Sequence, residues 1–312
     1  MADVRAASRR SAARSPLFAW AILLTAGVSW GATYSLAKLA TQDGAPPLGI
    51  ALWQGVVGAT LLGFVEAIRR RRLPLDRHHL LFYLVCGFLG TAIPSTLYFY
   101  AAPHLPAGVL AITLGLTPLL TFLGAVLLKL DRYALGRLLG VFLGIAAVLM
   151  IALPDASLPE RTAGIWVVVA LAAALSYAAE NIVIAKFRPP STQSLTILLG
   201  MMTVATLALV PIVLATGSFV PLAWPWGTVE WSIVGMAAIN VLSYWLFIYL
   251  VGTTGPIFAS QMAYLVMVSG VLWGILIFAE SHSGWIWGAL AVMLAGLSLV
   301  GQKSEDRSQK SE

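Results

Sequence analysis

Long apolar stretches separated by short polar breaks run along the chain. An α-helix needs about 20 mostly apolar residues to cross the roughly 30 Å of hydrocarbon in a bilayer. Ten stretches come close to that length: 18–40, 47–68, 79–101, 106–128, 135–153, 163–186, 192–216, 230–250, 256–279 and 284–301. Turn signals such as Gly252-Thr253-Thr254-Gly255-Pro256 separate them. The pattern predicts an all-α integral membrane protein with ten transmembrane helices.

The second half of the chain repeats the first. Five positions recur as identical or similar residues 149 positions later, namely Leu97, Tyr100, Leu116, Leu123 and Asp131 as Leu246, Tyr249, Leu265, Leu272 and Glu280. Each unit contains five spans, so the second unit must cross the membrane upside down relative to the first, as in many transporters. We therefore predict a basic N-terminus (1–17), a first five-helix repeat (18–153), an outer linker (154–162), a second repeat (163–301) and a tail (302–312).

Composition and charge support this interpretation and set the orientation. The chain is 59% hydrophobic and 10% charged. With a cytoplasmic N-terminus, 17 of the 19 basic residues fall on the inner side and only Lys38 and Arg161 on the outer side. This agrees with the positive-inside rule, so we expect a multi-pass protein of the bacterial inner membrane with both termini in the cytoplasm. The basic runs lack the folded soluble face that nucleic-acid binding needs, which excludes a nucleic-acid partner.

Glu180 is the most informative polar residue at membrane depth. A charge at the centre of a membrane helix costs on the order of 3 kcal/mol and usually marks a functional site. Tyr177, Glu180 and Asn181 share one helical face through their i, i+3, i+4 spacing. An aromatic ring, a carboxylate and an amide in one small volume suit a cationic or zwitterionic amine. The alternative is a protonated glutamate that only hydrogen-bonds a neighbouring helix.

Further aromatic and amide side chains extend this candidate site. In the first span, Trp30, Thr33 and Tyr34 stand at positions related by the repeat, with Thr33 in place of Glu180. Aromatic residues at helical spacing are also common in helix cores and on lipid-facing surfaces, but amides in hydrocarbon need partners. The predicted substrate-binding residues are Trp30, Thr33, Tyr34, Tyr98, Tyr177, Glu180, Asn181, Asn240, Tyr244, Gln261 and Tyr264.

Small residues mark a second feature, on spans five and ten. Gly136, Gly140 and Gly144 recur every four residues, and Gly284 and Gly288 stand at the corresponding place in the second half. Such spacing lets helices approach closely. It favours tight packing inside the protomer and a homodimer contact about equally.

The chain lacks the motifs of several other membrane protein classes. It has no HExxH or Walker sequence, its four histidines stand at span ends, and Cys86 is its only cysteine. Metalloprotease and ATP-driven pump functions therefore have no supporting residues. We expect no catalytic residue, no bound metal and no cofactor, and a protein that is not an enzyme.

Several short segments resemble a known transporter family. Ser29-Trp30-Gly31 with Lys38, the segment from Tyr98 into Leu116-Thr117-Pro118, and the acids Asp131 and Glu280 after spans four and nine resemble the EamA-type branch of the drug/metabolite transporter superfamily. The resemblance covers roughly residues 18–301. It implies a secondary transporter that exports amino acids or related small amines by alternating access around a central pocket. The alternatives are a proton-coupled multidrug or quaternary-ammonium exporter and a passive facilitator or channel.

Overall fold

The computed structural model describes residues 16–42, 44–153, 163–190, 192–222 and 224–301. Within them, ten helical segments are long and apolar enough to cross a membrane, which confirms the predicted fold class. Seven are continuous helices: α2 (Pro16–Thr41), α3 (Pro47–Ile68), α8 (Leu135–Ala152), α9 (Gly164–Phe187), α10 (Ser194–Ala215), α11 (Thr228–Thr254) and α14 (Gly284–Gly301). The predicted tail 302–312, the linker 154–162 and most of the basic N-terminus lie outside the described residues.

Three spans consist of more than one helical piece. The third combines α4 (Arg77–Gly87), the π-helical turn η1 (Phe88–Ala92) and α5 (Ile93–Ala101). The fourth is divided into α6 (Ala107–Leu114) and α7 (Thr117–Leu127), and the ninth into α12 (Pro256–Ser260) and α13 (Met262–Phe278). The fourth span bends where Pro118, which has no N–H, begins a new helix after Gly115. Interrupted helices near the membrane middle often flank transporter binding sites.

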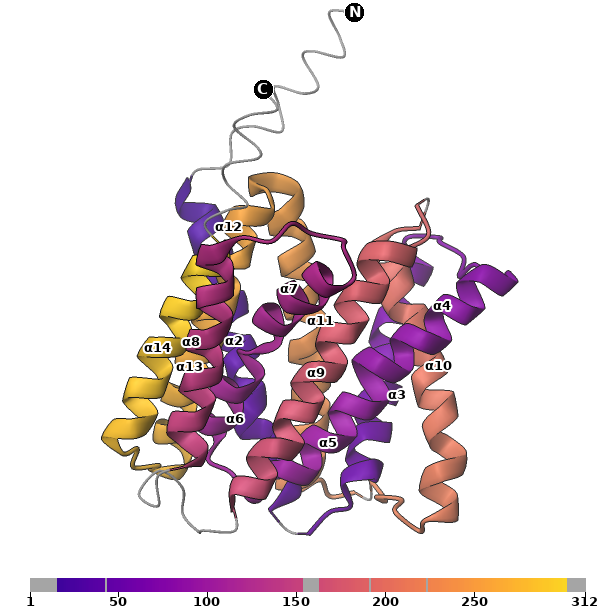
Figure 1. The fold of residues 1–312 in the computed structure, drawn as a ribbon. Helices are drawn as coiled ribbons and strands as arrows, with labels where there is room; N and C mark the ends of the chain where they lie inside the picture. The colour runs from indigo at the N-terminus through magenta and orange to yellow at the C-terminus, as the bar shows by residue number, and fades with distance from the viewer. Residues whose placement is uncertain (1–15, 43, 154–162, 191, 223, 302–312) are drawn as a thin grey trace, which may run out of the picture.

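The two halves pack across each other (Figure 1). The first helix of the first half, α2, packs against α11 and α13, the third and fourth spans of the second half. The first helix of the second half, α9, packs against α5 and α7, the third and fourth spans of the first half. The pairs α3 with α10 and α8 with α14 join corresponding helices of the two units. Such reciprocal packing is expected of two related halves in one bundle.

Corresponding helix ends carry the same local structure. Arg70 and Gly217, which follow the second helix of each half, both have positive φ angles, of 51° and 64°. In each case the next residue closes a six-residue turn, Arg71 N–H to Glu66 O at 2.9 Å and Ser218 N–H to Val213 O at 3.0 Å. These are Schellman-type helix ends, in which a left-handed residue allows the last carbonyls to be hydrogen-bonded.

Several glycines of spans five and ten make close contacts inside the protomer, whereas a Cβ on Gly136 or Gly284 would have no neighbour within 4 Å among the described residues. A Cβ atom on Gly140 would stand 2.6 Å from the Gly296 carbonyl oxygen, and one on Gly296 would stand 2.7 Å from the Gly140 carbonyl oxygen. Both distances are too short for any side chain, so α8 and α14 cross with their backbones in contact. Two other glycines of the predicted motif also pack within the protomer: Gly144 lies against the Leu119 side chain and Gly288 against the Met150 side chain. The homodimer stays a prediction.

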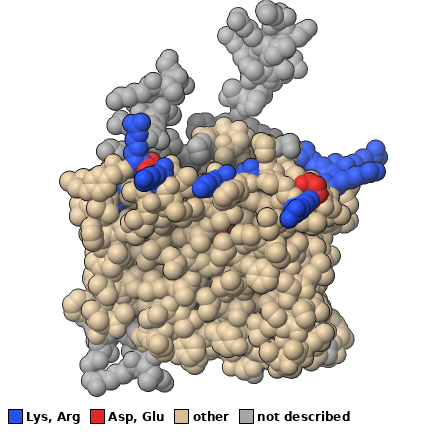
Figure 2. All heavy atoms as spheres, turned by 45° about the vertical axis from the view of Figure 1, so that its right-hand side comes forward, with Lys and Arg blue, Asp and Glu red and all other residues tan. Residues whose placement is uncertain are grey.

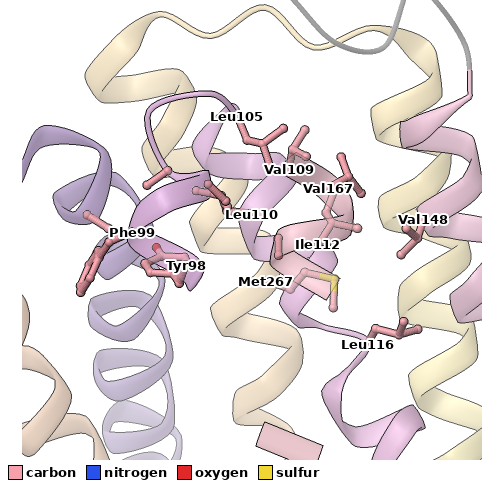
Figure 3. Packing of buried hydrophobic residues seen from close by; sticks show 14 of the residues in the cluster. Tyr98, Phe99, Leu105, Val109, Leu110, Ile112, Leu116, Val148, Val167 and Met267 are labelled. Carbon is pink, nitrogen blue, oxygen red and sulfur yellow. The ribbon is translucent and has the colours of Figure 1, made fainter. Parts of the chain in front are cut away.

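The surface of the bundle has the character of a lipid-facing protein. Large apolar side chains such as Leu149 on α8 and Leu207 on α10 are exposed. Lys and Arg gather near one end of the molecule in Figure 2, the end at which α2 begins and α14 ends. We call this end the inner end and the opposite one the outer end. The buried core lies between the helices and includes a dense apolar layer around α6 (Figure 3).

Candidate substrate site around Glu180

A π-helical turn in the third span shapes the wall opposite Glu180. The Ile93 N–H bonds the carbonyl of Phe88, five residues earlier. The next bond in that pattern would run from residue 94 to the Leu89 carbonyl, but Pro94 has no N–H. The Ser176 hydroxyl of α9 donates to the Leu89 oxygen instead, at 2.7 Å. The turn is thereby tied to α9, and π-helical turns of this kind are frequent at functional sites.

The carboxyl group of Glu180 lies directly against this turn. Glu180 is on α9, one turn after Ser176, and its carboxyl atoms occupy the space that any side chain at Gly90 would fill. Among the residues that the structure describes, none donates a hydrogen bond to this carboxyl group and no Lys or Arg pairs with it. An acid without a partner at membrane depth is costly. The carboxylate is therefore available to a ligand.

Two of the predicted tyrosines lie beside the carboxyl group, and two more, from other helices, extend the aromatic cluster away from it. Tyr177 and Tyr244 are close enough to Glu180 to interact with it electrostatically. Tyr34 and Tyr98 continue the group beside Tyr177, and their rings meet edge to face with centroids 6.0 Å apart. The Tyr98 hydroxyl is buried and has no hydrogen-bond partner in the part of the chain that the structure describes. The structure thus brings together five of the predicted residues.

Asn181 lies beside the same site, on its inner side. Its side-chain amide donates to the Thr121 hydroxyl at 3.2 Å and so joins α9 to α7. Asn181 is exposed and Glu180 is partly exposed, whereas Tyr98 is buried. Asn181 thus marks the exposed side of the site and Tyr98 its buried side.

Two of the predicted binding residues, Trp30 and Asn240, form a hydrogen bond with each other. The Trp30 indole N–H donates to the Asn240 side-chain oxygen at 2.9 Å, which joins α2 to α11. The Thr33 hydroxyl donates to the Trp30 carbonyl of its own helix at 2.6 Å. These contacts supply the partner that an amide needs in hydrocarbon. The structure gives Trp30, Thr33 and Asn240 a role in helix packing.

The predicted residues of span nine are placed elsewhere. Gln261 is exposed at the junction of α12 and α13, near the inner end. The Tyr264 hydroxyl lies near Gly301 at the inner end of α14, a helix that packs on α8 rather than on α9. The break in the ninth span starts α13 only at Met262, so Gln261 stands just before that helix and Tyr264 lies in its first turn.

Two residues of the group were absent from the sequence prediction. Ser95 lies within hydrogen-bonding reach of Tyr177, and Gly90 leaves the space that Glu180 fills. Pro94 was the available signal, because a proline inside a span frees carbonyls near it and gives neighbouring small or polar residues a role. Their exact partners depended on how the third span packs against α9, which sequence periodicity does not report.

A pocket lies at the outer end of the bundle. It is lined by the segments before α3 and α11, including Phe219, Val220 and Glu230. The Glu230 carboxylate accepts a hydrogen bond from the Gly227 backbone N–H at 2.9 Å, so it closes the first turn of its own helix. This pocket is remote from Glu180 and shares no residue with the tyrosine group.

Comparison with known proteins agrees with this architecture. The model of the EamA-like transporter family matches residues 17–153 and again 164–302. A Bacillus subtilis (strain 168) protein described as an uncharacterized transporter, YyaM, is 29% identical over 133 residues, which are 42% of this chain and 43% of the relative. The match thus spans less than half of that relative's length.

A solved crystal structure is similar over 92% of this chain and 98% of its own, with a TM-score of 0.59 and 18% identity. At that identity the likeness concerns the fold alone. The two family matches cover both five-helix units and nearly all of the described residues. The chain belongs to the EamA-like transporter family.

Proposed function

We propose that the protein is a secondary transporter that exports amino acids or related small amines across the bacterial inner membrane by alternating access. Family membership supports transport, and the inverted halves support alternating access around a site between them. The observation that carries the choice of substrate is the Glu180 carboxyl group, which is unpaired among the described residues and lies beside Tyr177 and Tyr244. A carboxylate attracts an ammonium group, and the aromatic faces add cation–π attraction.

Hydroxyl groups near the site can bind a polar group of an amine ligand. Tyr177 offers a hydroxyl group near the carboxylate with Ser95 within its reach, and the buried Tyr98 hydroxyl has no partner among the described residues. A ligand that carries a hydrogen-bonding group next to its amine can satisfy that hydroxyl, which is otherwise costly to bury. Zwitterionic amino acids have this character.

A proton-coupled exporter of quaternary ammonium compounds is the second candidate. The tyrosine faces favour it, because aromatic rings recognise cations that cannot donate hydrogen bonds. In that case Glu180 would exchange a bound cation for a proton. A quaternary ammonium ligand would leave the Tyr98 hydroxyl without a hydrogen bond, whereas a primary amine with a neighbouring polar group would not. Comparing the binding of these two ligand types therefore distinguishes the two proposed functions.

Thermal stabilisation of the purified protein by amines tests the proposed substrate class. We expect several amino acids or amines to raise the melting temperature, because a ligand that binds only the folded state stabilises it. The N-acetylated form of each active amine is the matched control, since it lacks the positive charge. Glu180→Gln should lose the response, and Val168→Ala, at an exposed position on α9, should keep it. Equal responses to amines and their acetylated forms would contradict the proposal.

We also propose that both chain ends are cytoplasmic. The gathering of Lys and Arg at the inner end supports this orientation. A cysteine at Gly217, in the turn after α10 at the outer end, should react with an impermeant reagent added to intact cells. A cysteine at Ser308, outside the described residues, should react only after the membrane is opened. The reverse pattern would invert the topology.

A further inference from the structure

One carboxylate joins three segments at the outer end of the bundle. Glu280 stands in the loop between α13 and α14, directly after Ala279, which holds a left-handed conformation with φ of 51°. Its Oε1 atom accepts hydrogen bonds from the Lys38 ammonium group of α2 at 2.7 Å and from the Ala107 N–H at 2.9 Å. The Gly108 N–H approaches Oε2 at 3.5 Å. A loop of the second half is thereby fastened to two helices of the first.

The carboxylate acts on α6 as a helix cap. The residue before this helix, Pro106, provides no side-chain hydrogen bond to the free N–H groups of the first turn. A negative charge at a helix N-terminus is favourable, because those N–H groups carry partial positive charge. Lys38 provides the balancing charge from the other side and also lies over the Phe278 ring, 4.7 Å from its centroid. Both charged side chains are largely buried, with 19% and 8% exposed.

His282 fills the remaining space in this cluster. Its ring is fully buried, with Nε2 3.6 Å from Glu280 Oε2, and it meets Trp287 of α14 edge to face. Gly108 has no side chain and so leaves room for the ring, since a Cβ there would stand 3.0 Å from Nε2. Burial lowers the pKa of His282 and so does Lys38, while Glu280 acts to raise it. The ring is therefore neutral at neutral pH, and Lys38 and Glu280 balance each other.

Between this cluster and the tyrosines, α13 packs closely against α6 and α2. A Cβ on Gly274 of α13 would stand 3.3 Å from Ala107, and one on Gly270 would stand 2.6 Å from Ala111 and 3.0 Å from Tyr34. Leu105, just before α6, and the α6 side chains Val109, Leu110 and Ile112 fill the neighbouring core, as Figure 3 shows. No glycine-free pair of helices could approach this closely. The outer end above Tyr34 and Tyr98 is closed.

The residues related by the repeat have other partners at the inner end. Asp131 corresponds to Glu280, and its carboxylate bonds the Arg137 guanidinium group at 2.7 Å and the Arg132 N–H at 2.7 Å. Lys186 corresponds to Lys38, yet it is exposed and lies 5.3 Å from the Phe187 ring centroid. Both Asp131 and Arg137 belong to the first half. Their bond therefore does not fasten one half to the other, in contrast to the bond between Lys38 and Glu280.

We propose that Lys38, Glu280 and the N-terminal turn of α6 form the outer gate of this transporter, closed in the structure and opened when the carboxylate leaves α6. The inference rests on the transport function proposed above. Opening separates the loop of residues 279–283 from α2 and α6, which uncovers the path to Tyr34 and Tyr98. The gate is distinct from the Glu180 carboxyl group, which lies nearer the inner end of the bundle than Tyr34 and Tyr98 do.

Reaction of a buried reporter cysteine from outside the cell tests the gate. Ser35 is suitable because it lies one turn inside Lys38 on the same side of α2 and is fully buried. Its hydroxyl has no hydrogen-bond partner among the residues described. We expect Ser35→Cys to react slowly with an impermeant thiol reagent in the otherwise native chain. Adding Glu280→Gln should speed the reaction about tenfold or more, because labelling follows the population of the open state. The native chain, with Cys86 alone, gives the background.

Two further variants make the result decisive. Glu230→Gln is the matched control, because it removes an outer-end carboxylate that caps a different helix, and it should leave the Ser35→Cys reaction unchanged. Lys38→Met combined with Glu280→Gln removes both charges without leaving either one buried alone, so it guards against misfolding, and it should also label fast. If both gate variants label as slowly as the reporter alone, the proposal is wrong. Because labelling needs no substrate, failure of amine binding leaves this outcome unaffected.

Discussion

The indole N–H of Trp30 and the side-chain oxygen of Asn240 form a 2.9 Å hydrogen bond between the first helix of one half and the third span of the other. We expect Trp30→Phe to destabilise the protein by about 1 kcal/mol, because it leaves the Asn240 amide without its partner in hydrocarbon. Thermal denaturation of the purified protein measures this loss. Trp231→Phe, at an exposed tryptophan, is the matched control and should change little.

The same pair separates a packing role from a binding role. If Trp30 and Asn240 serve helix packing, Trp30→Phe should keep the affinity for an amine ligand once the protein is stabilised by lower temperature. A variant that denatures as the wild type does but binds the amine weakly would return both residues to the substrate site.

The crossing of α8 and α14 makes a second prediction. Gly296→Leu should destabilise the protein by about 1–3 kcal/mol or more, because its side chain would overlap the backbone of Gly140. Gly136→Leu is the matched control, since nothing lies within 4 Å of a Cβ at that position. Melting temperature and yield report the difference. Equal stability of the two variants would mean that the helices are not in backbone contact.

Acid should weaken the outer cluster through His282. A histidine whose pKa is lowered by folding binds fewer protons in the folded state, so stability is complete above its usual pKa of about 6.5 and falls as pH drops below it. The groups that face the ring are Glu280, Lys38, Trp287 and the first turn of α6. We expect the melting temperature to fall between about pH 7.5 and about pH 5.5, and His282→Gln to reduce that dependence. An unchanged pH profile in this variant would assign the acid sensitivity to other groups.

Gly90 should control the position of the Glu180 carboxyl group. Gly90→Ala places a methyl group where the carboxyl atoms lie, so the side chain must turn away from the tyrosines. We expect about a tenfold or greater loss of amine affinity, which corresponds to about 1.4 kcal/mol. Gly63→Ala on α3 is the control, because its nearest neighbour would be Leu199 at 3.9 Å. Titration calorimetry can compare the two variants. Retained affinity in Gly90→Ala would remove the π-helical turn from the site.

The membrane architecture was accessible from the sequence because its causes are local. Apolar length, turn signals and charge distribution predicted the ten spans, and the recurrence of Leu97, Tyr100 and Asp131 in the second half predicted the two units. Each of these signals can be read along the chain without knowing which helices touch. The glycine motif was harder to interpret, because its spacing favoured packing inside the protomer and a homodimer contact equally. Only the crossing of α8 and α14 in the structure reveals that Gly140 meets Gly296.

The site was accessible only in part because it depends on how helices from the two halves meet. Helical spacing placed Tyr177 and Glu180 on one face, and the sequence also named Tyr34, Tyr98 and Tyr244, but only the structure shows that they lie near Tyr177 or Glu180. The same reasoning included Trp30 and Asn240, which bond each other. A polar side chain in a membrane needs a partner, but the sequence does not reveal whether that partner is a ligand or another helix.

Transport by Glu180→Gln in proteoliposomes tests the central claim most directly. The measurement is the flux of a radiolabelled amine identified by thermal stabilisation, at several pH values, with Val168→Ala as the control variant. We predict that Glu180→Gln folds normally and loses at least about tenfold of the wild-type flux together with its pH dependence, because the amide keeps the shape of the side chain but can neither attract the ammonium group nor exchange a proton. Wild-type flux with the same pH profile in Glu180→Gln would contradict the account and leave Glu180 as a structural residue.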